Sequence, residues 1–272
     1  MYDESHIIYS QIRLLSGRQM FDVELTTSCN KHCPVCPRDK MSRNGWHMSS
    51  DVFDLLCEWL PVDCDVFFAG LGEPLLHESC VVFINKLHNT GRKTSIMTNG
   101  TLLSKSKLEE LFSAGLDKLQ ISIIQQTDMP LIPQYVRLLD DNYKSRTVFN
   151  IIAETETVEM DSSLELLQNE GIRYYVKKVH NRAGYLYPSP NPGVLQTCAT
   201  FFCDTFIDAK GGIYTCSNDI NGRYCIGAID SMSFNDLLNY KKLFLGDKAV
   251  CSLCLQCTDE YRIKHFIDSS YE

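Results

Sequence analysis

The sequence contains no apolar run near the roughly 20 residues that a membrane-spanning helix needs. It also lacks a low-complexity tract, and its first residues lack the pattern of an export signal. Positive charge is scarce, because 26 Lys and Arg stand against 34 Asp and Glu, which gives a formal net charge of −8. A chain of this charge has no bulk attraction for nucleic acid. We therefore expect a cytoplasmic protein without a membrane or nucleic-acid partner.

Cysteine, in contrast, is abundant, with 13 residues in a chain of 272. An odd number in a chain without an export signal argues against a disulfide framework and favours metal ligation in a reducing cytoplasm. Two of the thirteen, Cys57 and Cys80, lie in apolar helical patterns, where a free cysteine packs as a small hydrophobic residue. Cys64 falls in a predicted loop and has no assigned role.

Three cysteines, Cys29, Cys33 and Cys36, follow the apolar run at residues 21–27 at spacings of four and three. Three thiolates are one too few to close a structural tetrahedral zinc site. They fit a [4Fe–4S] cluster with one iron left open for a ligand that the protein does not supply. The alternative is half of a zinc ribbon.

From residue 21 to residue 180, predicted strands alternate with helical patterns whose apolar residues recur three and four apart. The expected strands cover residues 21–27, 65–70, 93–99, 118–124, 147–154 and 172–180. This alternation predicts a parallel sheet with right-handed crossovers, which we interpret as a partial (β/α)6 barrel. Residues 1–20 are expected to form a short amphipathic helix packed across one end of that barrel.

Polar clusters follow the second, third and fourth strands. They are Gly70–Pro74, Thr98–Gly100, and Ser122 with the glutamines after it. Each cluster alone could be ordinary turn chemistry. All of them nevertheless lie at the carboxyl ends of the strands, where the cysteine motif also lies and where barrels collect their chemistry.

The three cysteines together with Gly-Glu-Pro after the second strand and Thr-Asn-Gly after the third resemble the radical S-adenosylmethionine (radical SAM) superfamily. The resemblance implies that Cys29, Cys33 and Cys36 hold a [4Fe–4S] cluster whose open iron chelates S-adenosylmethionine. It also implies residues around that cofactor. Those expected near the methionine amino group are Gly72, Glu73 and Pro74, and those near the carboxylate and ribose are Asn99 and Ser122. Val35, where the family usually has an aromatic residue, and Leu71, where it often has glycine, depart from the pattern.

After residue 185 a proline-rich connector precedes a cysteine-rich tail with a predicted hairpin at residues 206–216 and a helix at residues 234–240. By chemistry alone the tail cysteines could hold zinc or an iron–sulfur cluster. Their order resembles the shortened "twitch" form of the SPASM extension, which implies a second, auxiliary [4Fe–4S] cluster. The ligands expected from this resemblance are Cys198, Cys216, Cys254 and Cys257. Cys203 is the rival of Cys198, Cys251 is the rival of Cys254, and Cys225 is expected to be a packing residue.

These boundaries predict four parts. They are an N-terminal helical segment (1–20), the barrel (21–185), the auxiliary domain (186–257) and a C-terminal tail (258–272). The stretch Asn181–Gly184 is similar to one in a short radical SAM dehydrogenase type of aminocyclitol biosynthesis, which implies that Arg182 contacts substrate; a solvated turn arginine is the alternative.

The resemblance therefore implies an oxidoreductase that cleaves S-adenosylmethionine to a 5′-deoxyadenosyl radical and abstracts hydrogen from a substrate carbon. The second electron would pass to the auxiliary cluster, and the first would come from an external donor of the flavodoxin or ferredoxin type. The expected substrate is a small hydroxylated biosynthetic intermediate. The alternatives are a ribosomally made peptide that is cross-linked, given a thioether or epimerised and, more distantly, a non-catalytic iron–sulfur or zinc protein.

Overall fold

The computed structural model describes residues 4–155, 157–190, 198–247 and 250–259. Six parallel strands pair in chain order, as the sequence predicts. They are β1 (Gln19–Val23), β2 (Cys64–Phe68), β3 (Lys93–Thr98), β4 (Lys118–Ile124), β5 (Thr147–Ala153) and β6 (Arg173–Lys178). The predicted α/β class with a partial barrel is thereby confirmed.

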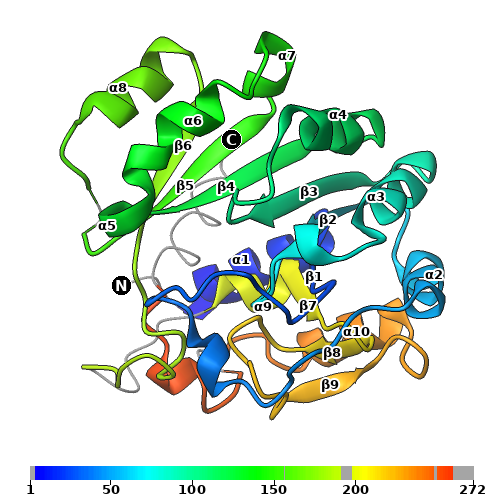
Figure 1. Cartoon of the computed structure of the whole chain (residues 1–272). Helices are drawn as coiled ribbons and strands as arrows, with labels where there is room; N and C mark the ends of the chain where they lie inside the picture. The colour runs from blue at the N-terminus through cyan, green and yellow to red at the C-terminus, as the bar shows by residue number, and fades with distance from the viewer. Residues whose placement is uncertain (1–3, 156, 191–197, 248–249, 260–272) are drawn as a thin grey trace.

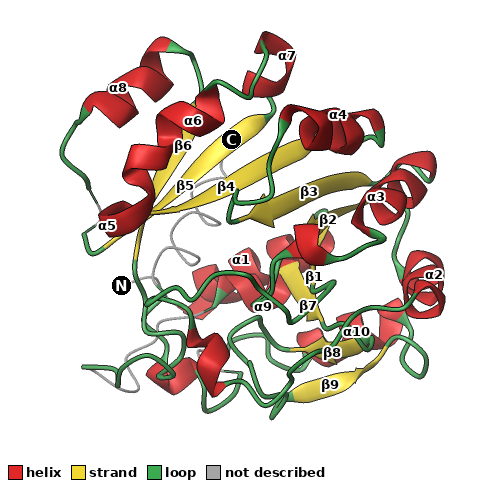
Figure 2. Ribbon diagram, in the orientation of Figure 1, coloured by secondary structure: helices red, strands yellow, loops and turns green. Residues whose placement is uncertain are grey.

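Helices follow the strands and cover the outer curve of the sheet (Figures 1 and 2). These helices are α2 (Ser50–Trp59), α3 (Cys80–Asn89), α4 (Lys105–Ser113), α5 (Gln125–Asp128), α6 (Ile132–Val136), α7 (Asp141–Lys144) and α8 (Ser162–Asn169). Single 3-10 turns lie at η1 (Pro37–Lys40), η2 (Pro74–Leu76) and η3 (Met129–Leu131). Side chains cap two of these helices at their N-termini, since Ser49 accepts from the amide of Val52, and Asp161 from the amides of Ser163 and Leu164.

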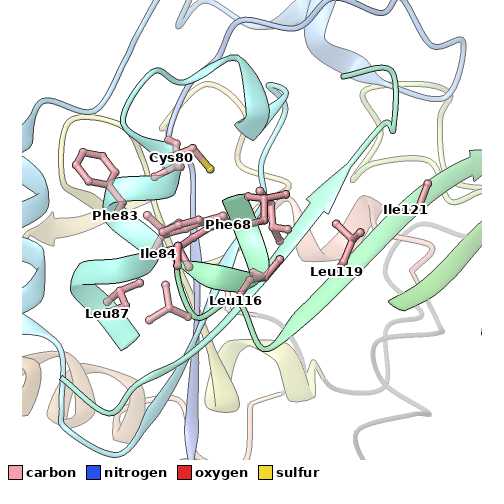
Figure 3. Close-up of a cluster of buried hydrophobic side chains, with 14 of the residues drawn as sticks. Phe68, Cys80, Phe83, Ile84, Leu87, Leu116, Leu119 and Ile121 are labelled. Carbon is pink, nitrogen blue, oxygen red and sulfur yellow. The ribbon is translucent and has the colours of Figure 1, made fainter. Parts of the chain in front are cut away.

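The strands present alternate residues to two environments. Phe21, Phe68 and Ile121 face the helices and lie fully in the core, whereas their neighbours Asp22, Phe67 and Ser122 line a cavity on the inner face. Figure 3 shows part of this core, with Phe83 of α3, Phe68 of β2 and Leu119 of β4 in one cluster of buried side chains. Burial of each such side chain contributes about 1.5–3 kcal/mol. The core therefore fixes which residues reach the cavity.

The first strand is shorter than predicted, because β1 ends at Val23 rather than Thr27. Beyond that point the amide of Glu24 donates to the carbonyl of Ile207, and Leu25 and Thr27 bond to the segment around Trp46 instead of to β2. Residues 24–27 thus bridge two neighbouring segments, and the cysteine motif begins beyond them.

The tail extends the same sheet. After α9 (Ala199–Cys203), strand β7 (Asp204–Ile207) pairs parallel with β1 on the edge opposite β2, and β8 (Gly212–Tyr214) and β9 (Cys225–Ala228) add antiparallel strands. The predicted hairpin is therefore present, but it continues the barrel sheet. Among the residues that the structure describes, β6 and β9 form the two edges of this nine-stranded sheet.

The remaining helical elements lie near β1 and β7–β9 in Figure 1. They are α1 (Glu4–Ser16), α10 (Phe234–Lys242) and the 3-10 turn η4 (Cys254–Gln256). The predicted N-terminal helix packs beside α9, and the side chain of Gln11 bonds to the backbone at residues 246 and 247. No described helix is both long and apolar enough to cross a membrane. Most of the predicted tail 258–272 lies outside the described residues.

Candidate functional site

The loop between β1 and η1 carries Cys29, Cys33 and Cys36, all half-buried. The amide of Cys36 donates to the carbonyl of Cys33 (3.0 Å), so the loop turns tightly between them. Burial raises the pKa of both the Cys33 and Cys36 thiols, and the neighbouring Cys29 raises it further. The three thiols therefore lie within electrostatic reach of one another.

Donors also surround the first sulfur. The amide of Lys31 lies 3.5 Å from Cys29 Sγ, and Asn99 Nδ2 lies 3.7 Å from the same atom. Such N–H groups stabilise negative charge on a ligating sulfur and adjust cluster potentials. The donor set is thus suited to an iron–sulfur cluster held by three thiolates.

No group of three His, Cys, Asp or Glu side chains close enough to share one metal ion is found within residues 4–155, 157–190, 198–247 and 250–259. A cubane binds each thiolate through a separate iron, and the sulfurs around it lie farther apart than those around a single ion.

Lys31 anchors this loop to the end of β4. Its Nζ lies 2.9 and 2.8 Å from the two carboxylate oxygens of Asp128, and Asp128 also accepts from the amide of Ile124 (3.1 Å). Asp128 is almost fully buried. Sequence reasoning missed this pair, because 97 residues separate its members and Asp128 belongs to no motif.

The motifs after β2 and β3 meet at the carboxylate of Glu73. That carboxylate accepts from Thr98 Oγ1 (2.7 Å), the amide of Asn99 (2.8 Å) and the amide of Leu75 (3.1 Å). Burial raises the pKa of Glu73, while these donors lower it in part. Glu73 therefore ties two strand ends together through its side chain.

Gly72 lies in a space too narrow for a side chain. A Cβ there would lie 2.0 Å from the carbonyl oxygen of Thr26 and 2.8 Å from that of Ser28. The amide of Glu73 donates to the same Ser28 oxygen (2.8 Å), so the glycine allows this loop to pack on the start of the cysteine motif. The contact of Gly72, Glu73 and Pro74 with a methionine amino group stays a prediction.

A cavity opens on the inner face of the sheet. It brings together Val35 of the cysteine loop, Ser122 of β4 and Arg182 from the turn after β6, and Asp22 and Asn150 make its wall polar. Asn150 is held by its side-chain bond to Gln120 (2.8 Å). Two predicted residues, Ser122 and Arg182, therefore share one cavity, whereas Gly72, Glu73, Pro74 and Asn99 lie outside its lining.

The tail cysteines fall into separate groups. Cys251 and Cys254 have their sulfurs 3.7 Å apart, and a hydrogen bond from Cys254 lowers the pKa of Cys251 to about 7. Cys216 lies near enough to Cys251 to act on it electrostatically, and Cys198 acts in the same way on the buried Cys203. The geometry thus gives more weight to Cys251 than the sequence did. Cys257 accepts from the amide of Asp259 (3.5 Å).

Four further cysteines lie outside these groups. Cys80 is buried and Cys57 packs against the core, as predicted. The prediction of Cys64 in a loop is wrong, because Cys64 is the first residue of β2 and is buried in the core. The interpretation of Cys225 as a packing residue is wrong, because its side chain is exposed and its thiol lies 3.2 Å from the carbonyl of Gly227. The first residue of the edge strand β9 is open to solvent.

A buried ion pair joins the barrel to the tail. Arg43 Nη1 lies 2.5 Å from Glu24 Oε2, Arg43 Nε donates to the carbonyl of Ile220 (3.0 Å), and Glu24 Oε1 accepts from the amide of Leu71 (3.1 Å). Asp208 lies 3.9 Å from Arg43 on the other side. Burial raises the pKa of Glu24, and Arg43 opposes that shift. A glutamate inside an apolar strand pattern was the only signal for this pair in the sequence.

One protein-family model matches part of this chain. Residues 23–154 match the model of the Radical SAM superfamily. Among curated proteins, the tungsten-containing aldehyde ferredoxin oxidoreductase cofactor-modifying protein of Pyrococcus furiosus is 30% identical over 104 residues, which are 37% of this chain and 29% of that protein. A probable GTP 3',8-cyclase of Methanothermobacter thermautotrophicus is 35% identical over 111 residues, 39% of this chain and 36% of that protein. A PqqA peptide cyclase of Bradyrhizobium diazoefficiens is 31% identical over 103 residues, which are 37% of this chain and 27% of that protein. The chain thus spans about a third or less of the length of these relatives.

Solved structures share the fold over more of the chain. The structure of BtrN in complex with AdoMet and 2-DOIA superposes with a TM-score of 0.67 at 20% identity, covering 89% of this chain and 94% of that one. The structure of anSMEcpe with bound AdoMet and Cp18Cys peptide superposes with a TM-score of 0.57 at 15% identity, covering 94% of this chain and 97% of that one. At these identities the likeness concerns the fold alone, and it extends through the cysteine-rich tail.

Proposed function

Because residues 23–154 are a radical SAM domain, we propose that this protein is a radical SAM oxidoreductase that oxidises a small hydroxylated biosynthetic intermediate. Cys29, Cys33 and Cys36 would hold one [4Fe–4S] cluster. The tail would hold a second through Cys198, Cys216, Cys254 and either Cys257 or Cys251. When bound, these clusters and S-adenosylmethionine supply a 5′-deoxyadenosyl radical for hydrogen abstraction and an acceptor for the electron left on the substrate.

The observation that carries this proposal is the cavity. Its lining combines Val35, between two cysteines of the first motif, with Arg182, whose turn is bonded to the segment around Cys254 and Cys257. A substrate bound there would lie between the two proposed clusters. The side chains that line the cavity would exclude water from the reacting carbon.

The protein groups at this cavity suit a hydroxylated substrate. Ser122, Asn150 and Asp22 offer hydrogen-bonding atoms on the inner wall, and Arg182 presents a guanidinium that stays protonated and donates in a planar fork. We assign Arg182 the role of holding a substrate oxygen. Ser122 and Asn99 would serve the carboxylate and ribose of S-adenosylmethionine.

A second candidate function is the modification of a ribosomally made peptide. It draws support from the PqqA peptide cyclases among the relatives and from the solved structure that contains a Cp18Cys peptide. The cross-link, thioether and epimerisation reactions would use the same radical domain. A non-catalytic iron–sulfur or zinc protein has no use for the shared contacts of Glu73 with both strand ends.

The proposed setting follows from the chemistry. A cluster that must be reduced by one electron requires an external donor, and we propose a flavodoxin or ferredoxin. Thirteen free cysteines and the oxygen sensitivity of the proposed clusters support a reducing cytoplasm as the proposed setting.

The test is an anaerobic reaction of the reconstituted protein with reductant and S-adenosylmethionine, analysed by mass spectrometry. We expect 5′-deoxyadenosine together with a product two hydrogens lighter than a supplied cyclitol or sugar alcohol, and transfer of deuterium from the carbinol carbon to 5′-deoxyadenosine. A product formed only from a supplied peptide would establish the second candidate. Absence of 5′-deoxyadenosine with every substrate would contradict both.

A further inference from the structure

The turn after β6 is bonded to the tail through one buried side chain, that of Asn181. Its Nδ2 donates to the carbonyl of Gln256 (2.6 Å), its backbone amide donates to Thr258 Oγ1 (3.0 Å), and its Oδ1 accepts from the amide of Thr258 (3.1 Å). The side chain of Asn181 has no solvent exposure. Three directional bonds therefore join this position to the segment that begins at Cys254.

A buried carboxylate reinforces the same contact. Asp259 Oδ2 lies 3.3 Å from His180 Nε2 and 3.6 Å from Lys177 Nζ, and Asp259 is almost fully buried. The end of β6 and residues 256–259 thus form one packed unit.

The turn also reaches the first cysteine loop. Lys40 donates to the carbonyl of Tyr185, and Tyr185 and Cys36 both pack against the buried cluster of Met41, Leu71 and Ile220. Residues 181–185 therefore touch both cysteine-bearing regions at once.

The backbone of this turn is strained. Arg182 and Ala183 have φ values of 52° and 54°, in the left-handed region that side chains other than glycine rarely adopt. Such a conformation persists only where the surroundings determine it. The carbonyl of Asn181 accepts from the amides of Gly184 (3.2 Å) and Leu186 (3.0 Å), so the bonds of Asn181 fix the turn from both directions.

We propose that Asn181 is a positioning residue through which the auxiliary segment, residues 254–259, holds Arg182 in its left-handed conformation facing the cavity. Assembly of the second metal site and order in the Arg182 turn are then coupled, and the coupling is reciprocal. This inference rests on the proposed function for the role of Arg182, whereas the coupling itself is a property of the chain.

Hydrogen exchange of the reconstituted protein, followed by mass spectrometry of the peptides covering 181–186 and 254–259, measures this coupling. We expect Asn181→Ala to accelerate exchange at least tenfold in both peptides and to speed the loss of about half of the iron to a chelator. Asn181→Asp keeps the acceptor for Thr258 but puts a carboxylate oxygen against the Gln256 carbonyl at a buried position, so it should accelerate exchange at least as much as Asn181→Ala. Gln256→Ala is the matched control, since it leaves the accepting carbonyl in place, and it should behave like the wild type.

The reciprocal arm uses Cys254→Ser, which removes a proposed ligand of the second cluster. We expect exchange at 181–186 to accelerate in this variant although residue 181 is unchanged. Wild-type exchange at 181–186 in Cys254→Ser, or equal effects of Gln256→Ala and Asn181→Ala, would overturn the inference. Failure to cleave S-adenosylmethionine would contradict the proposed function without altering these exchange rates.

Discussion

At the scale of single residues, the tail presents more thiols than one cluster needs. Cys251 and Cys254 have their sulfurs 3.7 Å apart, and Cys216 acts on Cys251, whereas Cys257 bonds to the backbone of Asp259. The sulfurs of Cys216, Cys251 and Cys254 thus lie close together before a cluster is bound, and this favours Cys251 over Cys257 as a ligand.

We therefore expect Cys251→Ser to lose about four irons, the content of one cube, and Cys257→Ser to keep them. Iron analysis and the absorbance of the reconstituted variants measure this. The opposite pattern would restore the ligand set expected from the sequence, with Cys257 in place of Cys251.

Arg182 gives a second prediction at this scale. Arg182→Lys keeps the charge but loses the planar fork. Loss of a charged hydrogen bond costs roughly 1.5–3 kcal/mol, or about one to two decades in kcat/KM on the true substrate. Arg173→Lys, at the exposed start of β6, is the control and should leave kcat/KM unchanged. Wild-type turnover by Arg182→Lys with both clusters intact would make Arg182 a solvated turn residue.

At the scale of elements, the buried pair of Arg43 and Glu24 joins β1 to the loop after β2 and to the β7–β8 hairpin. Removal of one partner from a buried pair leaves an uncompensated charge. We expect Arg43→Met to lower the free energy of unfolding by about 3–5 kcal/mol, measured by denaturant titration. Lys107→Met, which breaks an exposed pair with Glu110, should cost about 0–1 kcal/mol.

The pH dependence of Arg43→Met has a definite sign. Burial raises the pKa of Glu24 in the folded protein, and loss of Arg43 removes an opposing effect. A carboxyl whose folded pKa is raised contributes most stability below its unfolded pKa and loses it as the pH rises through the folded value. The defect of the variant should therefore be smaller near pH 5 than near pH 8. A constant defect across this range would mean that Glu24 finds another partner.

Elements were predicted well where the signal was local. The alternation of strands and helices depends on neighbours a few residues away, and the structure confirms it. The parallel pairing of β7 with β1 was not predicted, because no local pattern states which sheet edge a distant strand will join. The pairs Lys31–Asp128 and Arg43–Glu24 are equally non-local. Neither Arg182 nor Ala183 is a glycine, so their sequence does not signal their left-handed backbone.

At the scale of the whole molecule, one continuous sheet carries both cysteine-bearing regions. The cavity on its inner face is lined from the first cysteine loop, from β4 and from the turn after β6. Because that turn is hydrogen-bonded to residues 256–258, one side of the cavity is connected to the proposed site of the second cluster. This arrangement underlies the proposal that one substrate meets a radical source on one side and an electron acceptor on the other.

The most direct measurement of this account is 5′-deoxyadenosine production and iron content in the variant with Cys29, Cys33 and Cys36 all changed to alanine. The wild type, reconstituted without oxygen, should hold about eight irons and cleave S-adenosylmethionine, whereas the variant should hold about four and cleave none. Cys225→Ala, at an exposed cysteine outside every proposed ligand set, should match the wild type in both. Unchanged cleavage by the triple variant would contradict the central claim that these three thiolates hold the cluster that generates the radical.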